Sequence, residues 1–200
     1  MRAMQVAGYG EPLLLVEVPT PEPSAGEVRI TVHRAGVNFP DMLMIQGTYQ
    51  MRPEPPFAPG FEVAGVVSAL GAGVQGIAVG ERVMAYTPHG GYAEEVVTPA
   101  HSVFPIPDAV SFTDAAVVPI AYGTSHHALT DRAGLTEGEV LVVLGAAGGV
   151  GLAAVELGKV LGATVIGCVG ADWKAAAVRA RGADHVMTTA QRMSGAVSSN

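Results

Sequence analysis

A glycine-rich segment that follows an apolar stretch constrains the fold of this chain more than any other feature. Residues 145–151 read Gly-Ala-Ala-Gly-Gly-Val-Gly, directly after the apolar run Val140–Leu144. Ala146, Gly148 and Gly151 occupy the three glycine positions of the dinucleotide-binding pattern GxGxxG. In that pattern the second glycine lets the backbone approach a pyrophosphate, and the third permits close packing of the helix on the strand. The segment predicts a strand, a phosphate-binding turn and a helix. A glycine-rich turn that serves packing alone is the alternative.

The sequence on both sides of this turn alternates between strand-like and helix-like segments. The expected strands are residues 140–144, 164–169 and 185–187, and the expected helices are residues 149–161 and 172–181. Strands that alternate with helices indicate a parallel sheet built from βαβ units. Helical spacing with a break near Pro119 precedes them, from a Ser111 capping signal to Ala133. We therefore expect linking helices and the first half of a Rossmann-type α/β domain in residues 111–200.

The first 110 residues are rich in glycine and proline, with short alternating runs between turns. Val28, Ile30 and Val32 alternate with polar neighbours, as a half-buried strand does. Residues 61–69 and 96–103 have the same character, and a short helix is expected to begin at Pro40 and end at Gly47. Several short strands with frequent turns favour a small, partly open β-barrel. The predicted domains are thus residues 1–110 and 111–200.

The end of the second expected Rossmann strand indicates which cofactor is bound. An acidic residue there would hold a ribose 2′-hydroxyl and favour NAD. The stretch Cys168-Val169-Gly170-Ala171 contains no carboxylate, and Asp172 is placed better as a helix N-cap. Lys174 follows in the first helical turn, where the helix dipole disfavours a cation, so a phosphate partner would explain it. The pattern favours NADPH, with a solvated surface lysine as the alternative.

Charge and cysteine content exclude several classes of function. The formal net charge of -7 argues against binding to nucleic acid and to anionic membrane surfaces. The single cysteine, Cys168, cannot form an internal disulfide, which fits a reducing, cytoplasmic location. Residues Met1–Ala7 lack the layout of a signal peptide. The uncharged stretch Val140–Val155 is shorter than the ~20 residues of a membrane-spanning helix.

A set of short motifs also occurs along the chain in a characteristic order. They are Gly36-Val37-Asn38 with Asp41, Gln46-Gly47-Thr48-Tyr49, Pro59-Gly60-Phe61-Glu62-Val63-Ala64-Gly65, Gly80-Glu81-Arg82-Val83, Gly90-Gly91-Tyr92-Ala93-Glu94, Tyr122-Gly123-Thr124 and Ala146-Ala147-Gly148-Gly149-Val150-Gly151. Through these motifs the chain resembles, up to about Val186, the quinone oxidoreductase (zeta-crystallin-like) branch of the medium-chain dehydrogenases/reductases. The resemblance implies a GroES-like catalytic domain followed by a Rossmann domain, with the active site in the cleft between them.

The resemblance also implies an enzyme without a metal. Zinc-dependent relatives have a cysteine at the position of Asn38 and a histidine at the position of Phe61. A tetrahedral zinc site needs converging Cys, His or carboxylate ligands, and the sequence shows no such cluster. His126 and His127 are adjacent, so on a helix they would point in different directions. We expect no metal site.

The same resemblance assigns the candidate site residues. It places Asn38 and Tyr49 near the nicotinamide as catalytic candidates, and Thr124 close to the same ring. The complete set of predicted cofactor-binding residues is Tyr49, Thr124, Ala147, Gly148, Gly149, Val150, Gly151, Gly170 and Lys174. Asn38 could instead only cap the helix that begins at Pro40, Tyr49 could pack over residues 53–59, and Thr124 could be an ordinary helix residue. Asp41 is expected to be structural.

The expected function is metal-free hydride transfer from NADPH to a small-molecule quinone. Such a transfer builds negative charge on a carbonyl oxygen, which requires a hydrogen-bond donor in a dry cleft. The same apparatus would serve reduction of the C=C bond of an enone or enoyl thioester. A catalytically inactive, truncated nucleotide-binding module is the alternative of another class. Assembly into a homo-oligomer is left open.

The sequence departs from the family in its last part. A doubly wound domain has six parallel strands in the order 3-2-1-4-5-6, and only the first three are recognisable here. Relatives often have a Tyr-Arg-like pair after the third strand that helps to hold the 2′-phosphate, where this chain has Thr189 and Ala190. We expect a fragment or a truncated product with a bare strand edge at residues 140–144, weak cofactor binding and poor turnover. The tail at residues 194–200 is expected to be poorly ordered.

Overall fold

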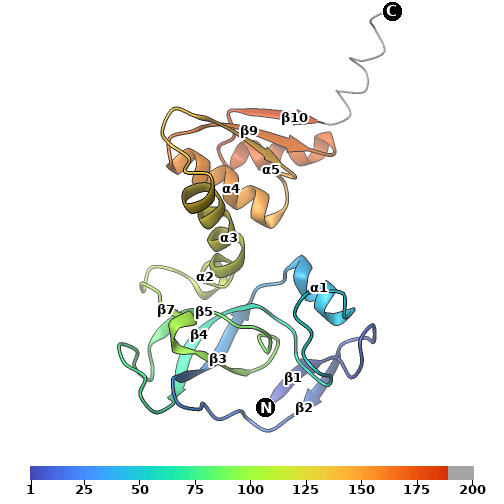
Figure 1. The fold of residues 1–200 in the computed structure, drawn as a ribbon, viewed down its shortest axis with the longest axis vertical. Coiled ribbons are helices and arrows are strands. Elements are labelled where there is room, and N and C mark those ends of the chain that lie inside the picture. The colour runs from blue at the N-terminus through green and yellow to red at the C-terminus, as the bar shows by residue number, and fades with distance from the viewer. Residues whose placement is uncertain (189–200) are drawn as a thin grey trace, which may run out of the picture. The chain divides into compact units, whose positions relative to one another are not determined.

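The computed structural model describes residues 1–188, and the expectations for Thr189, Ala190 and residues 194–200 lie outside this range. The chain divides into two compact units, Met1–Ile120 and a second unit that begins at Ala121 (Figure 1). The sequence-based domain boundary after residue 110 stays a prediction.

The first unit is built on a five-stranded antiparallel sheet in the order β6-β3-β4-β5-β7. The strands are β3 (Glu27–Ala35), β4 (Glu62–Leu70), β5 (Arg82–Tyr86), β6 (Glu95–Pro99) and β7 (Val103–Pro105). A separate hairpin pairs β1 (Arg2–Gln5) with β2 (Leu14–Glu17). The sheet has two free edges, β6 and β7, within the described residues, which confirms the expected partly open β-barrel.

The core of this sheet follows from the alternation of apolar residues along each strand. Val28 and Ile30 of β3, Val63 and Val67 of β4, and Val83 of β5 are fully or almost fully buried and pack together. Side chains that point to one face of a sheet recur at every second position, so these valines and isoleucines form a continuous apolar layer. In β3 the polar residues Arg29 and Thr31 take the alternate positions.

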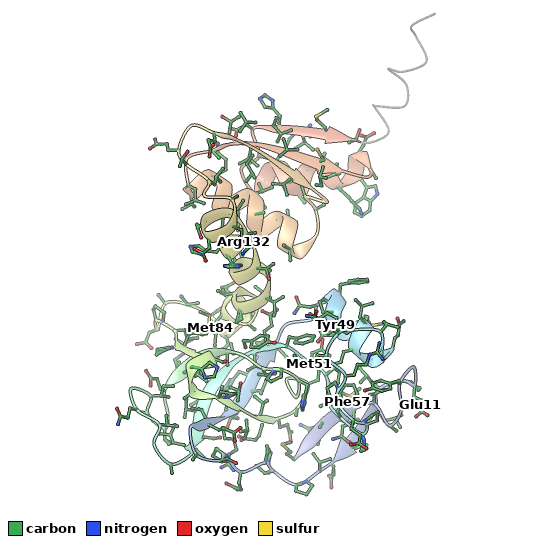
Figure 2. The ribbon with its side chains drawn as sticks, viewed as in Figure 1. Glu11, Tyr49, Met51, Phe57, Met84 and Arg132 are labelled. Carbon is green, nitrogen blue, oxygen red and sulfur yellow. The ribbon has the colours of Figure 1, made fainter. Side chains whose placement is uncertain are left out.

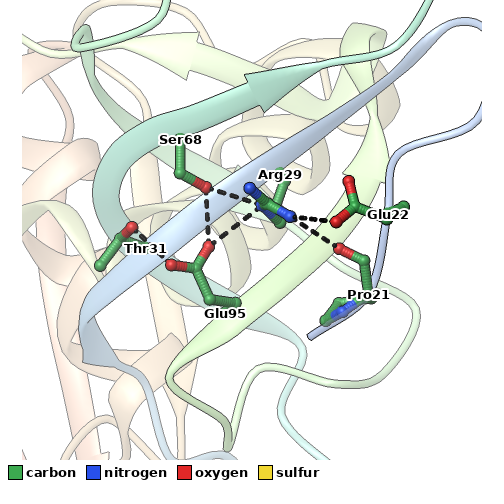
Figure 3. Close-up of polar contacts among 6 residues, drawn as sticks. All are labelled: Pro21, Glu22, Arg29, Thr31, Ser68 and Glu95. Atoms are coloured by element: carbon green, nitrogen blue, oxygen red, sulfur yellow. Dashed lines mark hydrogen bonds and ion pairs between the residues drawn. The ribbon is translucent and has the colours of Figure 1, made fainter. Parts of the chain in front are cut away.

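A polar network joins three strands of the first unit (Figure 3). The Glu95 carboxylate of β6 accepts hydrogen bonds from Ser68 Oγ at 2.7 Å and from Thr31 Oγ1 at 2.8 Å. Arg29 Nε donates to Ser68 Oγ at 3.1 Å and lies 3.5 Å from Glu95 Oε2, while Arg29 Nη1 reaches Glu22 at 3.0 Å. Cross-strand pairs of this kind help to set the register of β3, β4 and β6.

One expected strand is wrong in extent. Residues 96–103 do not form a single strand: β6 ends at Pro99, a short 3₁₀ turn, η1 (Ala100–Ser102), follows, and β7 begins at Val103. Proline has no backbone N–H to donate to a neighbouring strand, so the ladder is interrupted there. The Ala100 N–H bonds instead to the carbonyl oxygen of Gly26 at 2.9 Å.

The helices of the first unit are short and begin where the sequence signals them. α1 (Phe39–Ile45) has Asn38 at its N-cap position, and Gly47 follows it with a φ of 68°, a left-handed conformation that suits glycine. α2 (Phe112–Ala115) is capped by Ser111, whose Oγ accepts a hydrogen bond from the Asp114 N–H at 3.1 Å. Both helix starts confirm the sequence-based expectation.

The helical segment from Val118 to Arg132 contains two wide turns. π-helical turns η2 (Val118–Tyr122) and η3 (His127–Arg132) flank the short helix α3 (Gly123–His126). The expected break near Pro119 therefore takes the form of a wide turn. Such turns occur mostly as local bulges within α-helices.

The second unit is a parallel sheet with helices between successive strands, as expected. Its elements are β8 (Val140–Leu144), α4 (Gly149–Val160), β9 (Thr164–Val169), η4 (Asp172–Lys174), α5 (Ala175–Ala180) and β10 (His185–Thr188). The strand order β10-β9-β8 is parallel throughout and corresponds to the 3-2-1 half of a doubly wound sheet. The second helix begins as a 3₁₀ turn with Ala171, and not the expected Asp172, at the N-cap position.

Only one side of this small sheet is packed within the described part of the chain. Val143, Val155, Val165 and Val178 form the buried core together with smaller residues of α4 and α5. The alternate side chains of β8 are exposed, with Val140, Val142 and Leu144 at 61%, 54% and 79%. β8 is also an edge of the sheet among the residues that the structure describes. An apolar edge strand of this kind is a site for association with other chains.

Candidate active site and nucleotide-binding turn

The glycine-rich turn of the second unit is held by backbone hydrogen bonds to the neighbouring strand. Gly145 follows β8 with a φ of 64°, and the Ala146 N–H donates to the carbonyl oxygen of Cys168 in β9 at 3.0 Å. The Gly148 N–H then donates to the carbonyl oxygen of Gly145 at 3.0 Å and closes the turn. The tight turn is therefore made by Gly145, one residue before the position that Ala146 occupies in the pattern.

Glycine is present at different positions of the turn for different physical reasons. A side chain on Gly149 would meet no atom within 4 Å, and one on Gly148 would come no closer than 3.5 Å to Gly145 O. A Cβ on Gly151 would instead lie 2.4 Å from the carbonyl oxygen of Gly145 and 2.8 Å from Ala146 Cα. Gly151 is required for helix–strand packing, whereas the backbone at Gly148 and Gly149 is open to a ligand.

The start of α4 provides donors for an anion at this open backbone. The first N–H groups of a helix have no acceptor within the helix, and the helix dipole adds a partial positive charge. Val150 is exposed at the start of α4, while Ala147 packs against the core of the unit. This arrangement fits the pyrophosphate of a dinucleotide.

The end of β9 carries a cation and no acidic side chain before Asp172. Gly170 follows the strand, and a side chain there would meet nothing within 4 Å. The Lys174 N–H closes the next turn on the Ala171 carbonyl oxygen at 3.1 Å, and Lys174 Nζ lies 5.1 Å from the ring centroid of Trp173. The structure brings Gly170 and Lys174 to the same carboxyl edge of the sheet as the glycine-rich turn, because β8 and β9 are parallel neighbours.

Thr124 belongs to the second unit and is exposed on α3. Its neighbour Ser125 is buried and donates from Oγ to the carbonyl oxygen of Val150 at 2.8 Å. This bond fixes α3 against the first turn of α4. Thr124 therefore lies next in the chain to a residue that contacts the glycine-rich turn.

In the first unit, Asn38 is part of a partly buried polar cluster, the Asn38 cluster, formed with Tyr92 and the buried residues Asp41 and Glu62. The amide Nδ2 of Asn38 donates to Glu62 Oε1 at 2.8 Å, and its backbone N–H donates to Asp41 Oδ2 at 2.7 Å. The Tyr92 hydroxyl donates to Asp41 Oδ2 at 2.9 Å. Asn38 thus occupies the N-cap position, and its side-chain amide is also oriented by a buried carboxylate.

Tyr49 lies beside the same segment. Its ring makes an edge-on contact with the buried Phe61, with 5.6 Å between the centroids, and Phe61 is the chain neighbour of Glu62. Tyr49 and Met51 lie together in the apolar cluster around Phe61 (Figure 2). The segment Phe61–Glu62 therefore brings Asn38 and Tyr49, the two catalytic candidates, to one region.

The two carboxyl groups of the Asn38 cluster have perturbed acidities. Burial raises the pKa of Asp41, although hydrogen bonds from Asn38, Tyr92 and Gly60 oppose the rise. Burial also raises the pKa of Glu62, opposed by the bonds from Asn38 and from the Ile120 N–H at 2.8 Å. The pKa of Tyr92 is raised by burial and by the charge of Asp41. Gly36 leaves the space for Glu62, because a Cβ there would lie 2.2 Å from Glu62 Oε1.

Sequence reasoning did not single out Glu62 or Ser125. A signal for Glu62 was present, since a glutamate that interrupts the buried apolar run Phe61–Val67 needs buried partners. Ser125 had no local signal, because its partner lies 25 residues further along the chain.

A separate cavity of about 430 Å³ in the first unit contains none of the predicted site residues. Pro53, Phe57 and His89 are among the residues that line it, and burial lowers the pKa of His89. Its size alone does not make it the reacting site, because neither Asn38 nor Tyr49 reaches it.

Metal-ligand clusters and membrane-spanning helices are both absent from residues 1–188. These residues contain no group of three or more His, Cys, Asp or Glu side chains arranged to hold a metal ion. No helix among them combines the length and apolar character needed to cross a membrane.

Comparison with known proteins shows which proteins the chain resembles. Residues 24–108 match the alcohol dehydrogenase GroES-like domain. Over 175 residues the chain is 41% identical to quinone oxidoreductase-like protein 2 of Bos taurus, covering 86% of this chain and 50% of that protein. Over most of its length the chain is thus similar to quinone oxidoreductase-like proteins, and it contains a GroES-like domain of the alcohol dehydrogenase type.

Two further proteins are similarly related to the chain. The chain is 42% identical over 159 residues to the mouse synaptic vesicle membrane protein VAT-1 homolog-like, covering 78% of this chain and 38% of that protein. The quinone oxidoreductase of Thermus thermophilus, also solved in complex with NADPH, superimposes with a TM-score of 0.85 at 37% identity, over 98% of this chain and 63% of that one. The chain thus spans 38–50% of the length of the two curated relatives named here.

Proposed function

We propose that this chain is part of a metal-free oxidoreductase that uses NADPH to reduce a small-molecule quinone. The observation that carries the proposal is the turn at residues 145–151, which presents open backbone at Gly148 and Gly149 beside a strand end with a lysine and no carboxylate before Asp172. The name of the Thermus relative and its complex with NADPH support the same assignment.

The second unit would hold the cofactor. The pyrophosphate would lie on the amides at the start of α4, and Gly170 leaves room for the ribose at the end of β9. Lys174 would pair with the 2′-phosphate, and a charge-assisted contact of this kind is worth roughly 1.5–3 kcal/mol. Thr124, on α3, is proposed to lie near the nicotinamide.

The first unit would supply the groups that act on the substrate. Bound NADPH would supply the hydride. The carbonyl oxygen of the quinone would gain negative charge in the reaction and would need a hydrogen-bond donor. One N–H of the Asn38 amide is bonded to Glu62, so the second is left as a donor of fixed direction. The Tyr49 hydroxyl is a second donor in the same region. Donors already in place where charge develops stabilise the transition state more than mobile water does.

The first test measures activity directly. NADPH consumption with phenanthrenequinone is followed for the 200-residue chain and for a chimaera that continues it with the remaining segment of the Thermus relative. We expect turnover by the chimaera and little turnover by the 200-residue chain. The rate of the chimaera with cyclohexenone shows whether C=C bonds are also reduced. Absence of NADPH consumption by the chimaera with either acceptor would contradict the proposal.

Cofactor choice is tested with one substitution in the chimaera. Lys174→Ala should weaken NADPH binding roughly tenfold to a hundredfold, the equivalent of the lost phosphate contact, and leave NADH binding unchanged. Arg179→Ala, an exposed basic residue of α5, is the matched control and should affect neither cofactor. Equal losses for both cofactors with Lys174→Ala would place this lysine outside the phosphate site.

A further inference from the structure

We infer that Trp173 is the adenine-stacking residue of the nucleotide site, and that it acts as a pair with Lys174 on an adenine nucleotide that carries a 2′-phosphate. This inference rests on the proposed function and extends it to a residue that the glycine-rich motif does not include. All of its supporting contacts lie within the second unit.

The exposure of Trp173 is the first observation. The indole is 79% exposed, although it is the largest apolar side chain of the unit and the only tryptophan of the chain. An aromatic side chain of this size commonly buries roughly 150–250 Å² when it packs, so leaving it in water forfeits a large stabilisation. A flat ligand that covers the ring would recover it.

The position of Trp173 is the second observation. It lies in η4, shortly after β9 ends at Val169. The glycine-rich turn is tied to the same strand end by the bond from the Ala146 N–H to the Cys168 carbonyl oxygen. A dinucleotide whose pyrophosphate lies at that turn extends its adenosine across the end of the second strand. No side chain stands in the way at Gly170.

The contact between Trp173 and Lys174 is the third observation. Lys174 Nζ lies 5.1 Å from the indole centroid, within the ~6 Å range of a cation–π interaction. The ammonium group is thereby held over one face of the ring. The opposite face is left for a stacked adenine, and the ammonium stays available to a phosphate on its ribose. Stacking on an aromatic side chain and pairing with a cation are the two contacts that a 2′-phosphorylated adenosine offers at once.

The acidic residue Asp172 leads to a competing assignment of the nucleotide site. Its carboxylate is exposed and precedes Trp173 directly. If Asp172 accepted hydrogen bonds from the ribose hydroxyls, the site would prefer a nucleotide without the 2′-phosphate. Acidic residues at the end of the second strand confer that preference. The two assignments therefore differ in the ligand that binds more tightly.

The experiment uses the single tryptophan as its own reporter. Fluorescence of the 200-residue chain is titrated with adenosine 2′,5′-bisphosphate and, separately, with adenosine 5′-monophosphate. We expect saturable quenching by the bisphosphate at a dissociation constant roughly tenfold or more below that of the monophosphate, the equivalent of one charge-assisted phosphate contact. No saturable change with the bisphosphate, or equal or tighter binding of the monophosphate, would overturn the inference.

Two variants separate stacking from a general effect on the fold. Trp173→Ala should weaken the bisphosphate roughly fivefold or more by calorimetry, which corresponds to about 1 kcal/mol of lost stacking, and Trp173→Phe should restore most of the affinity. Phe39→Ala removes an equally exposed aromatic residue of the first unit and should have no effect. Unchanged affinity in Trp173→Ala would also overturn the inference. Adenosine 2′,5′-bisphosphate lacks a nicotinamide. Its binding therefore tests this inference even if the proposed hydride transfer is not observed.

Discussion

At the scale of single residues, the burial of Glu62 makes the stability of the fold depend on pH. Its side chain is 1% exposed, and burial raises the pKa of its carboxyl from the ordinary value of 4.5. The folded state therefore binds a proton more tightly than the unfolded chain does. The resulting contribution to stability is fully present below the unfolded pKa and is lost as the pH rises through the folded pKa.

Glu62→Gln tests this linkage because it keeps the side-chain volume and removes the titration. We expect the free energy of unfolding of Glu62→Gln, relative to the unsubstituted chain, to improve steadily as the pH rises from 4.5 towards neutrality. Urea unfolding at several pH values measures the difference. The exposed Glu11→Gln should show no such trend, and a pH-independent difference for Glu62→Gln would show that its charge is not penalised in the fold.

At the scale of elements, the strand–turn–helix of the second unit separates packing from ligand access. Gly151→Ala would place a methyl group 2.4 Å from the Gly145 carbonyl oxygen, and overpacking of this kind typically costs about 1–3 kcal/mol. Gly149→Ala meets open space and should be neutral or stabilise by about 0.4–1 kcal/mol through the unfolded state. Denaturant unfolding of the two variants compares them. Equal destabilisation by both would mean that the turn tolerates no side chain at all, contrary to this interpretation.

Local patterns were sufficient for much of the fold. The strands β8 and β9, the glycine-rich turn and the capped start of α2 follow from neighbouring residues, so sequence predicts them. The break at Pro99 was missed because residues 96–103 are rich in residues that favour strands, although Pro99 lacks a backbone N–H donor. Glu62 was missed because its partners, Asn38 and Ile120, are distant in sequence and meet it only after folding. The roles of Asn38 and Tyr49 came from resemblance and stay predictions.

At the scale of the whole molecule, the exposed edge strand β8 dominates the expected solution behaviour. Val140, Val142 and Leu144 are exposed beside unpaired backbone groups at this edge of the described sheet. We expect the 200-residue polypeptide to associate as its concentration rises, measured by light scattering, because apolar edges pair with other chains. Val142→Lys should suppress association. Val160→Lys, which removes an 81% exposed valine from the end of α4, is the control. Equal effects of the two substitutions would show non-specific association through exposed apolar residues, and not pairing at β8.

The two wide turns in the segment from Val118 to Arg132 have a consequence for comparing related sequences. A π turn encloses one more residue within each hydrogen-bonded ring than an α turn does. Deleting one residue within η2 or η3 would return that turn to α geometry while the residues on either side keep their facing. When a related sequence is one residue shorter between Val118 and Arg132, we therefore expect the gap to lie inside one of these turns, with Ser125, which lies between them, still aligned.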